Sequence, residues 1–416
     1  MASSKPLEHA FVSAVVKGIK PEIVLPRIIT QGLAELGIVL SARSVAALKR
    51  QIKVRGDDQL SIEIDDEGHP GLSESAIRET VEVFFKDLGL RVTKVCNRLR
   101  RTMPRLLDDF ITSLADASFA DGVNRRPDAL RDSRRVHATL RRQIRALWGD
   151  GLDALEAQIG IVTEIAMRYA AQNDAKDTRS GWRTRSVLIR QHARACQIAR
   201  EILLLLNNGY ADGAHARWRT LHEVAAVACF IARYGDKAAY RYTLHETVDS
   251  ARGAHTQLET WPALASDAKF VKNMKTLDRQ RVKLVAKFGD AFSGDYGWAA
   301  PFLGGTRPTF RDIERAVQLD PVRPHYQLAN LNIHAGSKGI AFRLGLGPLP
   351  NEVILAGPSP FGLEDPGRIT SYSLMQFTVT LLTYQCNIER LALARLVMKI
   401  ADESTAGFRA GAEAVG

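Results

Sequence analysis

The segment richest in potential chemistry is residues 215–232, HARWRTLHEVAAVACFIA. A histidine can act as a general acid or base, and an arginine can stabilise the charge that develops on a phosphate. On a helix, Arg219 and Glu223 share a face because they are four residues apart, and His222 is three residues from Arg219. Arg217 points about 140° away from His222, at 100° per residue. The nine residues after Glu223 are all apolar, so we expect a buried helix whose flanking charges must be paired.

A second set of polar side chains recurs at helical spacing in residues 322–335. Arg323, Tyr326, Asn330 and His334 follow one another at three or four residues, so they line one face of a helix as a supporting stripe. We expect the two polar stripes to face each other inside an apolar bundle. Such an arrangement is either a reaction site or a buried network that fixes the register of the helices without chemistry.

Burial of Glu223 would cost the most free energy in this arrangement, since Glu223 is the only charge between Arg219 and Arg233 in an otherwise apolar helix. Arg219 is its nearest partner, and a planar guanidinium can bind a carboxylate through two hydrogen bonds. His334 is the one donor of the second stripe that can change its protonation state. We therefore predict one buried network formed by Arg219, Glu223 and His334.

The sequence motifs for metal and cofactor sites are incomplete. Two His-Glu pairs, at 222–223 and 245–246, begin like the H-E-x-x-H motif of zinc proteases, but neither has a histidine four residues after the first. The four cysteines form no C-x-x-C pair, which argues against a zinc ribbon or a redox motif. The chain also has no Walker loop and no G-x-S-x-G turn. We expect neither a metal nor a cofactor.

Positive charge is concentrated in one part of the chain. The formal net charge is +11, and residues 91–148 hold fourteen Arg and Lys against six Asp, a surplus of eight. Within this segment, Arg134, Arg135, Arg141 and Arg142 are the candidates for contacts with an acidic partner such as nucleic acid. The alternative is a solvated helix face that binds no partner.

The spacing of apolar residues predicts an all-α fold, a multi-helix bundle with a small, mostly helical N-terminal unit. We divide the chain into residues 1–90 as an α(+β) unit, 91–150 as an arginine-rich helical connector, 151–402 as the helical bundle and 403–416 as a flexible tail. Only residues 59–64 alternate polar and apolar side chains as a strand does. The predicted helices of the bundle span residues 152–172, 182–207, 210–233, 236–259, 266–289, 309–319, 322–335 and 367–402.

Several residues of the first part of the chain set the expected helix ends. Ser41 and Ser73 are typical N-caps, and Gly89 is a typical helix stop. The apolar side chains of residues 106–114 have helical spacing, which predicts that this stretch packs on another part of the protein. Residues 121–135 contain Gly, Pro and dense charge, so we interpret them as a linker or the exposed start of a helix.

The composition is that of a globular protein, with 45% hydrophobic and 25% charged residues. The chain has no run of eighteen apolar residues, the length that a membrane span requires. The apolar stretch at 10–16 ends at Lys17 and lacks the longer core and the cleavage site of a secretory signal. We therefore expect a cytoplasmic protein with no membrane partner.

Residues 150–395 resemble a bacterial family of unknown function that carries the number 5677. The resemblance rests on the stretch LLLLNNGYADGAHARWRTLHE, on the later HYQLANLNIHAGSKG and on the GPSPFG loop before the last helix. It implies a helical fold and does not imply a reaction. The first 150 residues are not part of it.

A second resemblance is to HEPN ribonucleases of toxin and phage-defence systems. These helical proteins carry an Arg, four to six residues and then a His, and Arg217-Trp-Arg-Thr-Leu-His222 has that spacing. The resemblance implies RNA cleavage without a metal, in a homodimer that brings two copies of the motif together. The chain departs from the pattern at Trp218, where a small polar residue is usual.

Two functions from different classes follow. The first is a metal-independent ribonuclease, in which His222 is the general acid or base and Arg217 or Arg219 stabilises the charge on phosphate. Glu223 and His334 belong to the same candidate site, and the basic segment holds the RNA. The second is a non-enzymatic binding or regulatory module, whose buried polar residues are structural and whose basic segment binds an acidic partner.

Overall fold

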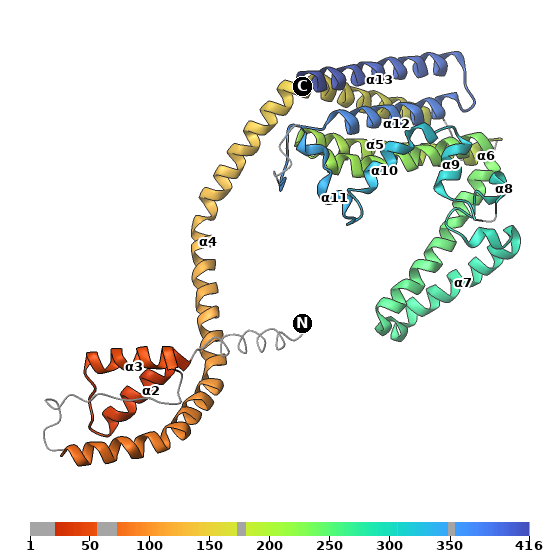
Figure 1. Ribbon diagram of the computed structural model, residues 1–416. Helices are drawn as coiled ribbons and strands as arrows, with labels where there is room; N and C mark the ends of the chain where they lie inside the picture. Colours follow the sequence, from red (N-terminus) through yellow and green to blue (C-terminus); the bar gives the residue numbers. More distant parts are fainter. Residues whose placement is uncertain (1–20, 56–72, 173–179, 306, 348–353, 416) are drawn as a thin grey trace. The chain divides into compact units, whose positions relative to one another are not determined.

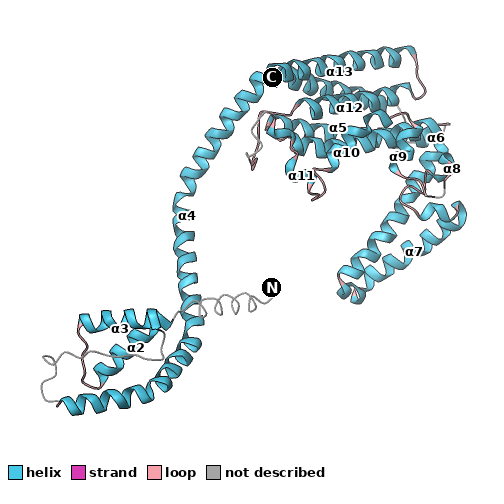
Figure 2. Cartoon of the chain, in the orientation of Figure 1, coloured by secondary structure: helices cyan, strands magenta, loops and turns pink. Residues whose placement is uncertain are grey.

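The computed structural model describes residues 21–55, 73–172, 180–305, 307–347 and 354–415. Every regular element in these ranges is a helix, and no strand occurs among them (Figure 2). The prediction of an all-α fold is therefore confirmed. The strand predicted at 59–64 lies outside the described residues. Of the helices described, none combines the length and the apolar composition that a membrane span needs.

The chain divides into two compact units, Met1–Leu130 and Arg131–Gly416. Helix α4 (Glu74–Ala171) runs through both of the boundaries that the sequence predicts near residues 90 and 150. Gly89 does not end a helix, because its backbone keeps a negative φ angle. A glycine inside a helix costs only about 1 kcal/mol relative to alanine, and good helix formers surround this one.

The first unit consists of α2 (Pro21–Glu35), α3 (Ala42–Arg55) and the beginning of α4. Their buried apolar side chains, among them Leu33 and Phe84, form a separate small core. The two predicted N-caps are confirmed. The hydroxyl of Ser41 accepts a hydrogen bond from the backbone of Ser44 at 3.2 Å, and Ser73 caps α4 in the same way.

The middle of α4 differs from two expectations. The sequence predicts that residues 106–114 pack on another part of the protein, but Leu106, Phe110 and Leu114 are 60%, 65% and 57% exposed. Residues 121–135 form neither a linker nor a helix start, since they lie inside the helix and are exposed throughout. The helix therefore continues here without burying an apolar face of its own.

The second unit is a bundle of long helices. The end of α4 packs with α5 (Trp182–Asn207), α6 (Ala211–Thr260), α12 (Glu364–Thr383) and α13 (Ile388–Val415), and these helices lie side by side in Figure 1. Their inward faces are apolar and share one continuous core. This arrangement removes the apolar stripe of each helix from water.

The last helix, α13, is part of this bundle. The sequence predicts a flexible tail over residues 403–416, but α13 continues through nearly all of this segment. Phe408 is fully buried, and its ring centroid lies 6.5 Å from that of Trp148. A Cβ atom on Gly407 would lie 2.5 Å from the backbone nitrogen of Gly151. The small residues of the segment therefore permit close helix packing instead of fraying.

Glycines end the long helices at the predicted places. Gly209, Gly235 and Gly289 have φ angles of 78°, 67° and 88°, a region that favours glycine. At Gly235 the chain bends and then continues as the second half of α6. This second half packs against α7 (Ala268–Phe288).

The helix predicted at 367–402 is divided into α12 and α13. The break contains Gln385, whose φ angle is 57°. Its side chain accepts a hydrogen bond from Arg185 at 2.5 Å and donates one to the carbonyl of Ser180 at 2.9 Å. Contacts with distant residues therefore hold this turn. The short helices of the unit are η2 (Pro262–Ser266), η3 (Asp290–Ser293), α8 (Ala300–Leu303), α9 (Phe310–Ala316), η4 (Asp320–Val322), α10 (Arg323–Asn330), α11 (Lys338–Ala341) and η5 (Leu344–Leu346).

Candidate functional site

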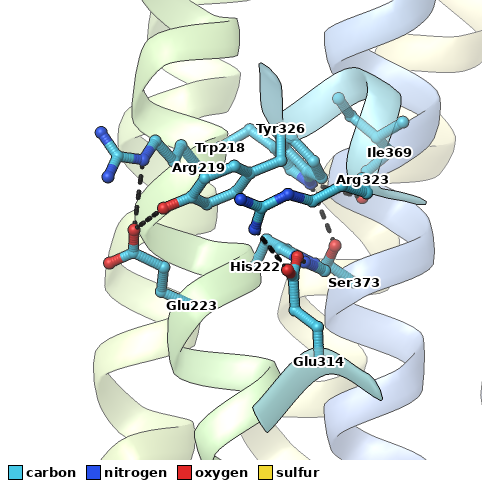
Figure 3. Close-up of polar contacts among 9 residues, drawn as sticks. All are labelled: Trp218, Arg219, His222, Glu223, Glu314, Arg323, Tyr326, Ile369 and Ser373. Carbon is cyan, nitrogen blue, oxygen red and sulfur yellow. Dashed lines mark hydrogen bonds and ion pairs between the residues drawn. The ribbon is translucent and has the colours of Figure 1, made fainter. Parts of the chain in front are cut away.

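Helix α6 carries a buried stack of three rings. The ring centroid of Trp218 lies 5.6 Å from that of His215 and 5.2 Å from that of His222, each at an interplanar angle of 25°. The indole nitrogen of Trp218 donates to the carbonyl of Ile369 and to the hydroxyl of Ser373, both at 3.0 Å (Figure 3). A buried indole N–H needs such acceptors, and these two fix α6 against α12.

His222 belongs to a buried ionic cluster. Its Nε2 lies 2.9 Å from Oε1 of Glu314 on α9, and both side chains are at most 1% exposed. Arg323 at the start of α10 donates to the other oxygen of Glu314 at 2.5 Å. A carboxylate without access to water needs partners of this kind. The cluster ties α6, α9 and α10 together (Figure 3).

A second cluster lies beside it and joins the two predicted polar stripes. Arg219 and Glu223 form an ion pair at 3.1 Å, and the hydroxyl of Tyr326 donates to Glu223 at 2.5 Å. The guanidinium groups of Arg219 and Arg323 lie 4.7 and 4.8 Å from the centre of the Tyr326 ring. Burial, together with the hydrogen bond to Glu223, raises the pKa of Tyr326. The phenol therefore stays protonated and acts as a donor.

The structure differs from the predicted network in two members. His334 is exposed in the turn after α10, because the helix ends at Asn330 and the backbone amides of residues 331–333 bond carbonyls only three residues back. Tyr326 takes the expected place of the histidine. The deeply buried carboxylate is Glu314, whereas the side chain of Glu223 is 32% exposed. Asn330 places its Oδ1 atom in the interior without a hydrogen-bond partner among the described residues.

Arg217 and His222 do not converge. Arg217 is one-third exposed, and its Nε pairs with Glu201 on α5 at 2.5 Å. His222 pairs with Glu314 in the interior instead. The angle of about 140° between the two positions on a helix accounts for this difference.

A large pocket borders the second cluster. Its volume is 1170 Å³, and α5, α6 and residues 295–310 contribute to its wall. Arg190 and Arg194 of α5 line it and form no ion pair with any described residue. Glu223 lines it from α6, so it connects the polar network to the pocket. Burial and the neighbouring Glu223 raise the pKa of Tyr296, also in this wall, to about 12.

The four arginines predicted to contact nucleic acid are all exposed on α4. Arg134 and Arg141 line a hollow of 170 Å³ together with Tyr210, and neither forms an ion pair with a residue that the structure describes. Arg135 and Arg142 have only weak partners, an aspartate at 3.8 Å and a threonine hydroxyl at 3.2 Å. Their positive charge is therefore largely uncompensated.

Comparison with known proteins gives one match. Residues 185–348 match DUF5677, a family of unknown function. No curated protein and no solved structure matches the chain.

The DUF5677 match covers less than half of the chain and lies inside the predicted range of 150–395. It includes both polar clusters and most of the pocket wall. The arginines of α4 and the whole of α12 lie outside it. The resemblance to a family of unknown function is therefore confirmed for this part of the chain, and the resemblance to HEPN ribonucleases stays a prediction.

One group of side chains has no counterpart in the sequence analysis. His215, His325 and Asp365 each place one potential metal-ligand atom within 4.8 Å of the others. Burial lowers the pKa of His215 to about 4, and the hydrogen bond to Asp365 raises the pKa of His325. The three residues lie on three helices and far apart in the chain, so no local spacing marks them. The expectation of no metal site rested on local motifs alone.

Proposed function

We propose that this protein binds single-stranded nucleic acid, and RNA in particular, on the exposed arginine face of α4. The observation that carries the proposal is the hollow in which Arg134 and Arg141 meet the 42% exposed ring of Tyr210. Proteins that bind single strands combine positive side chains for the backbone with aromatic rings for the bases. This is the second of the two functions considered above, a binding module.

The spacing of the arginines supports contact with a phosphate chain. Arg134 and Arg141 are seven residues apart, as are Arg135 and Arg142, so they form two parallel rows on the helix. Each row is about 10.5 Å long at 1.5 Å per residue. This length is about three times the axial rise of about 3.4 Å per phosphate that a strand has when its bases are stacked as in a double helix.

The test is a binding titration of a fluorescent single-stranded RNA at low salt, read by anisotropy. Replacing the four arginines by glutamate should abolish binding, since each reversal removes one phosphate contact and adds repulsion. The control reverses four exposed charges of α7, namely Lys269, Lys272, Lys275 and Arg279. Equal weakening by both variants would show general electrostatic attraction only and would reject the α4 site.

The aromatic contact has its own variant. Tyr210→Ala should weaken binding by about 1–3 kcal/mol, the usual contribution of one stacked base. Tyr372 has a similar exposure of 43% on α12, so Tyr372→Ala is the matched control and should bind RNA as the wild type does. An unchanged affinity of Tyr210→Ala would remove base stacking from the proposal.

A second candidate is RNA cleavage in the pocket, and the position of Glu223 favours it. Glu223 faces the pocket on one side and is held by Arg219 and Tyr326 on the other, as a general base would be. Arg190 and Arg194 on the opposite helix would hold the phosphate. Here Glu223 takes the catalytic role that the sequence analysis gives to His222. The homodimer and the toxin or phage-defence role implied by the HEPN resemblance belong to this candidate alone.

Incubation of the protein with labelled RNA in EDTA tests this candidate. Cleavage is expected, and Glu223→Gln should abolish it while RNA binding persists. Glu246→Gln, at another acidic residue of the same pocket wall, is the control and should cut at the wild-type rate. Intact RNA, or equal rates for Glu223→Gln and the wild type, would leave the binding function as the account of this protein.

A further inference from the structure

The group formed by His215, His325 and Asp365 is built from three separate helices. His215 lies in the first turns of α6, His325 on α10 and Asp365 in the first turn of α12. One potential ligand atom of each lies within 4.8 Å of the other two. We infer that these residues form a binding site for a divalent transition-metal ion of the zinc class.

The surroundings of His215 favour a ligand on its ring. Its side chain is 0% exposed, and neither Nδ1 nor Nε2 forms a hydrogen bond of normal geometry with the described residues, although the backbone of His325 lies close enough to interact with the ring. A buried polar group without a partner is unfavourable, and native proteins avoid it almost everywhere. A metal ion bound by one ring nitrogen would satisfy this histidine. Ring stacking on Trp218 already fixes the orientation of the imidazole.

The types of ligand atom in this group indicate which ion it would bind. Imidazole nitrogens suit zinc and the neighbouring transition metals, whereas calcium and magnesium prefer oxygen ligands alone. A tetrahedral zinc ion with bonds of about 2.0–2.1 Å holds its ligand atoms roughly 3.3 Å apart. Nδ1 of His325 and Oδ2 of Asp365 are 3.0 Å apart. Small side-chain rotations would therefore complete the set.

The surroundings keep one side of the site accessible. The side chains of His325 and Asp365 are 38% and 30% exposed. Three protein ligands with solvent on one side leave the fourth position to water or to an added ligand, as in catalytic zinc sites. The cation nearest in sequence to Asp365, Arg368, is paired with Glu364 at 2.7 Å. Its charge is thus partly compensated.

The scaffold of the site is rigid. Trp218 stacks on His215 and donates hydrogen bonds to two groups of α12, the helix that carries Asp365. These contacts hold the N-terminal half of α12 against the beginning of α6. Preorganised ligands of this kind favour metal binding, because little ordering remains to be done when the ion arrives.

The test is calorimetric titration of the metal-stripped full chain with Zn²⁺, and separately with Co²⁺, whose visible spectrum reports coordination. We expect one ion per chain. His325→Ala and Asp365→Ala should each weaken binding more than about 100-fold, since even the loss of an outer-shell partner costs 10–100-fold. Both residues are partly exposed, so the variants should fold, and circular dichroism checks this. His215→Ala is less informative, because it opens the core beside Trp218.

His255→Ala is the matched control. His255 lies 3.0 Å from both oxygens of Asp278. Among the described residues, no second histidine completes a metal-binding group with this His–Asp pair. The His255→Ala variant should bind zinc as tightly as the wild type. No saturable binding by the wild type would overturn the proposal, and so would equal affinities of the wild type, His325→Ala and Asp365→Ala. The outcome is independent of RNA binding, which uses other residues.

Discussion

At the scale of single residues, Glu314 holds the polar interior together. It is fully buried and bonds both His222 and Arg323, so its removal would leave two donors without a partner. We predict that Glu314→Ala lowers the free energy of unfolding by about 3–5 kcal/mol, the usual cost of breaking a buried ion pair. Urea denaturation followed by circular dichroism measures this change.

The control for Glu314 is an exposed ion pair. Glu164 and Arg168 are 2.6 Å apart, and their side chains are 64% and 76% exposed. Glu164→Ala should change the free energy of unfolding by less than about 1 kcal/mol, because water screens such pairs. Similar losses for Glu314→Ala and Glu164→Ala would contradict the description of the buried cluster.

His192 predicts how stability depends on pH. It is fully buried, bonds the Thr378 hydroxyl at 2.9 Å, and burial lowers its pKa from 6.5 to about 4. Between these values the unfolded chain binds a proton that the folded protein does not. The free energy of unfolding should therefore fall as the pH is lowered from 6.5 towards 4, by at most about 1.4 kcal/mol per pH unit from this residue.

The variant His192→Gln separates this effect from the rest of the acid response. Its unfolding free energy should change less between pH 6.5 and 4 than that of the wild type. The slope should not vanish, since burial lowers the pKa of His215 in the same direction. Parallel pH profiles for His192→Gln and the wild type would show that His192 does not contribute.

At the scale of elements, the bend in α6 orients half of the pocket wall. Gly235 has φ 67° and ψ −153°, a conformation that residues with a Cβ atom adopt only with strain. Gly235→Ala should lower the free energy of unfolding by about 1–3 kcal/mol. Gly253 lies in the same helix without a positive φ angle and with open space at its Cβ position. Gly253→Ala should be neutral or stabilise by up to about 1 kcal/mol, and equal effects at both positions would argue against strain at Gly235.

The ends of helices could be predicted where residues near them in the sequence determine them. The glycines at 209, 235 and 289 end helical patterns, and the structure bends or ends helices there. The break at Gln385 could not be predicted, because side chains some 200 residues away hold it. The prediction that a helix ends at Gly89 is wrong, since α4 continues through it. A glycine ends a helix only where the chain also turns.

The same limit applies to the candidate site. The pairing of Arg219 with Glu223 follows from their spacing of four residues. Glu314 could not be identified, because its partner His222 lies 92 residues away and on another helix. The stripe on α10 included His334 only because the sequence does not show where that helix ends.

At the scale of the whole molecule, the net charge of +11 is not spread evenly, since residues 91–148 alone hold a surplus of eight positive charges. The arginines of α4 lie outside the DUF5677 match, whereas the pocket and the polar clusters lie mostly within it. We therefore expect the binding of nucleic acid and the role of the pocket to be separable by mutation.

The most direct test of the central claim is the salt dependence of RNA affinity. The logarithm of the binding constant should fall linearly with the logarithm of the salt concentration, by about 0.7 for each phosphate neutralised on a single strand. A variant with alanine at Arg134, Arg135, Arg141 and Arg142 should bind more weakly, with a slope less steep by roughly 3. Identical slopes for this variant and the wild type, or no RNA binding at low salt, would contradict the account.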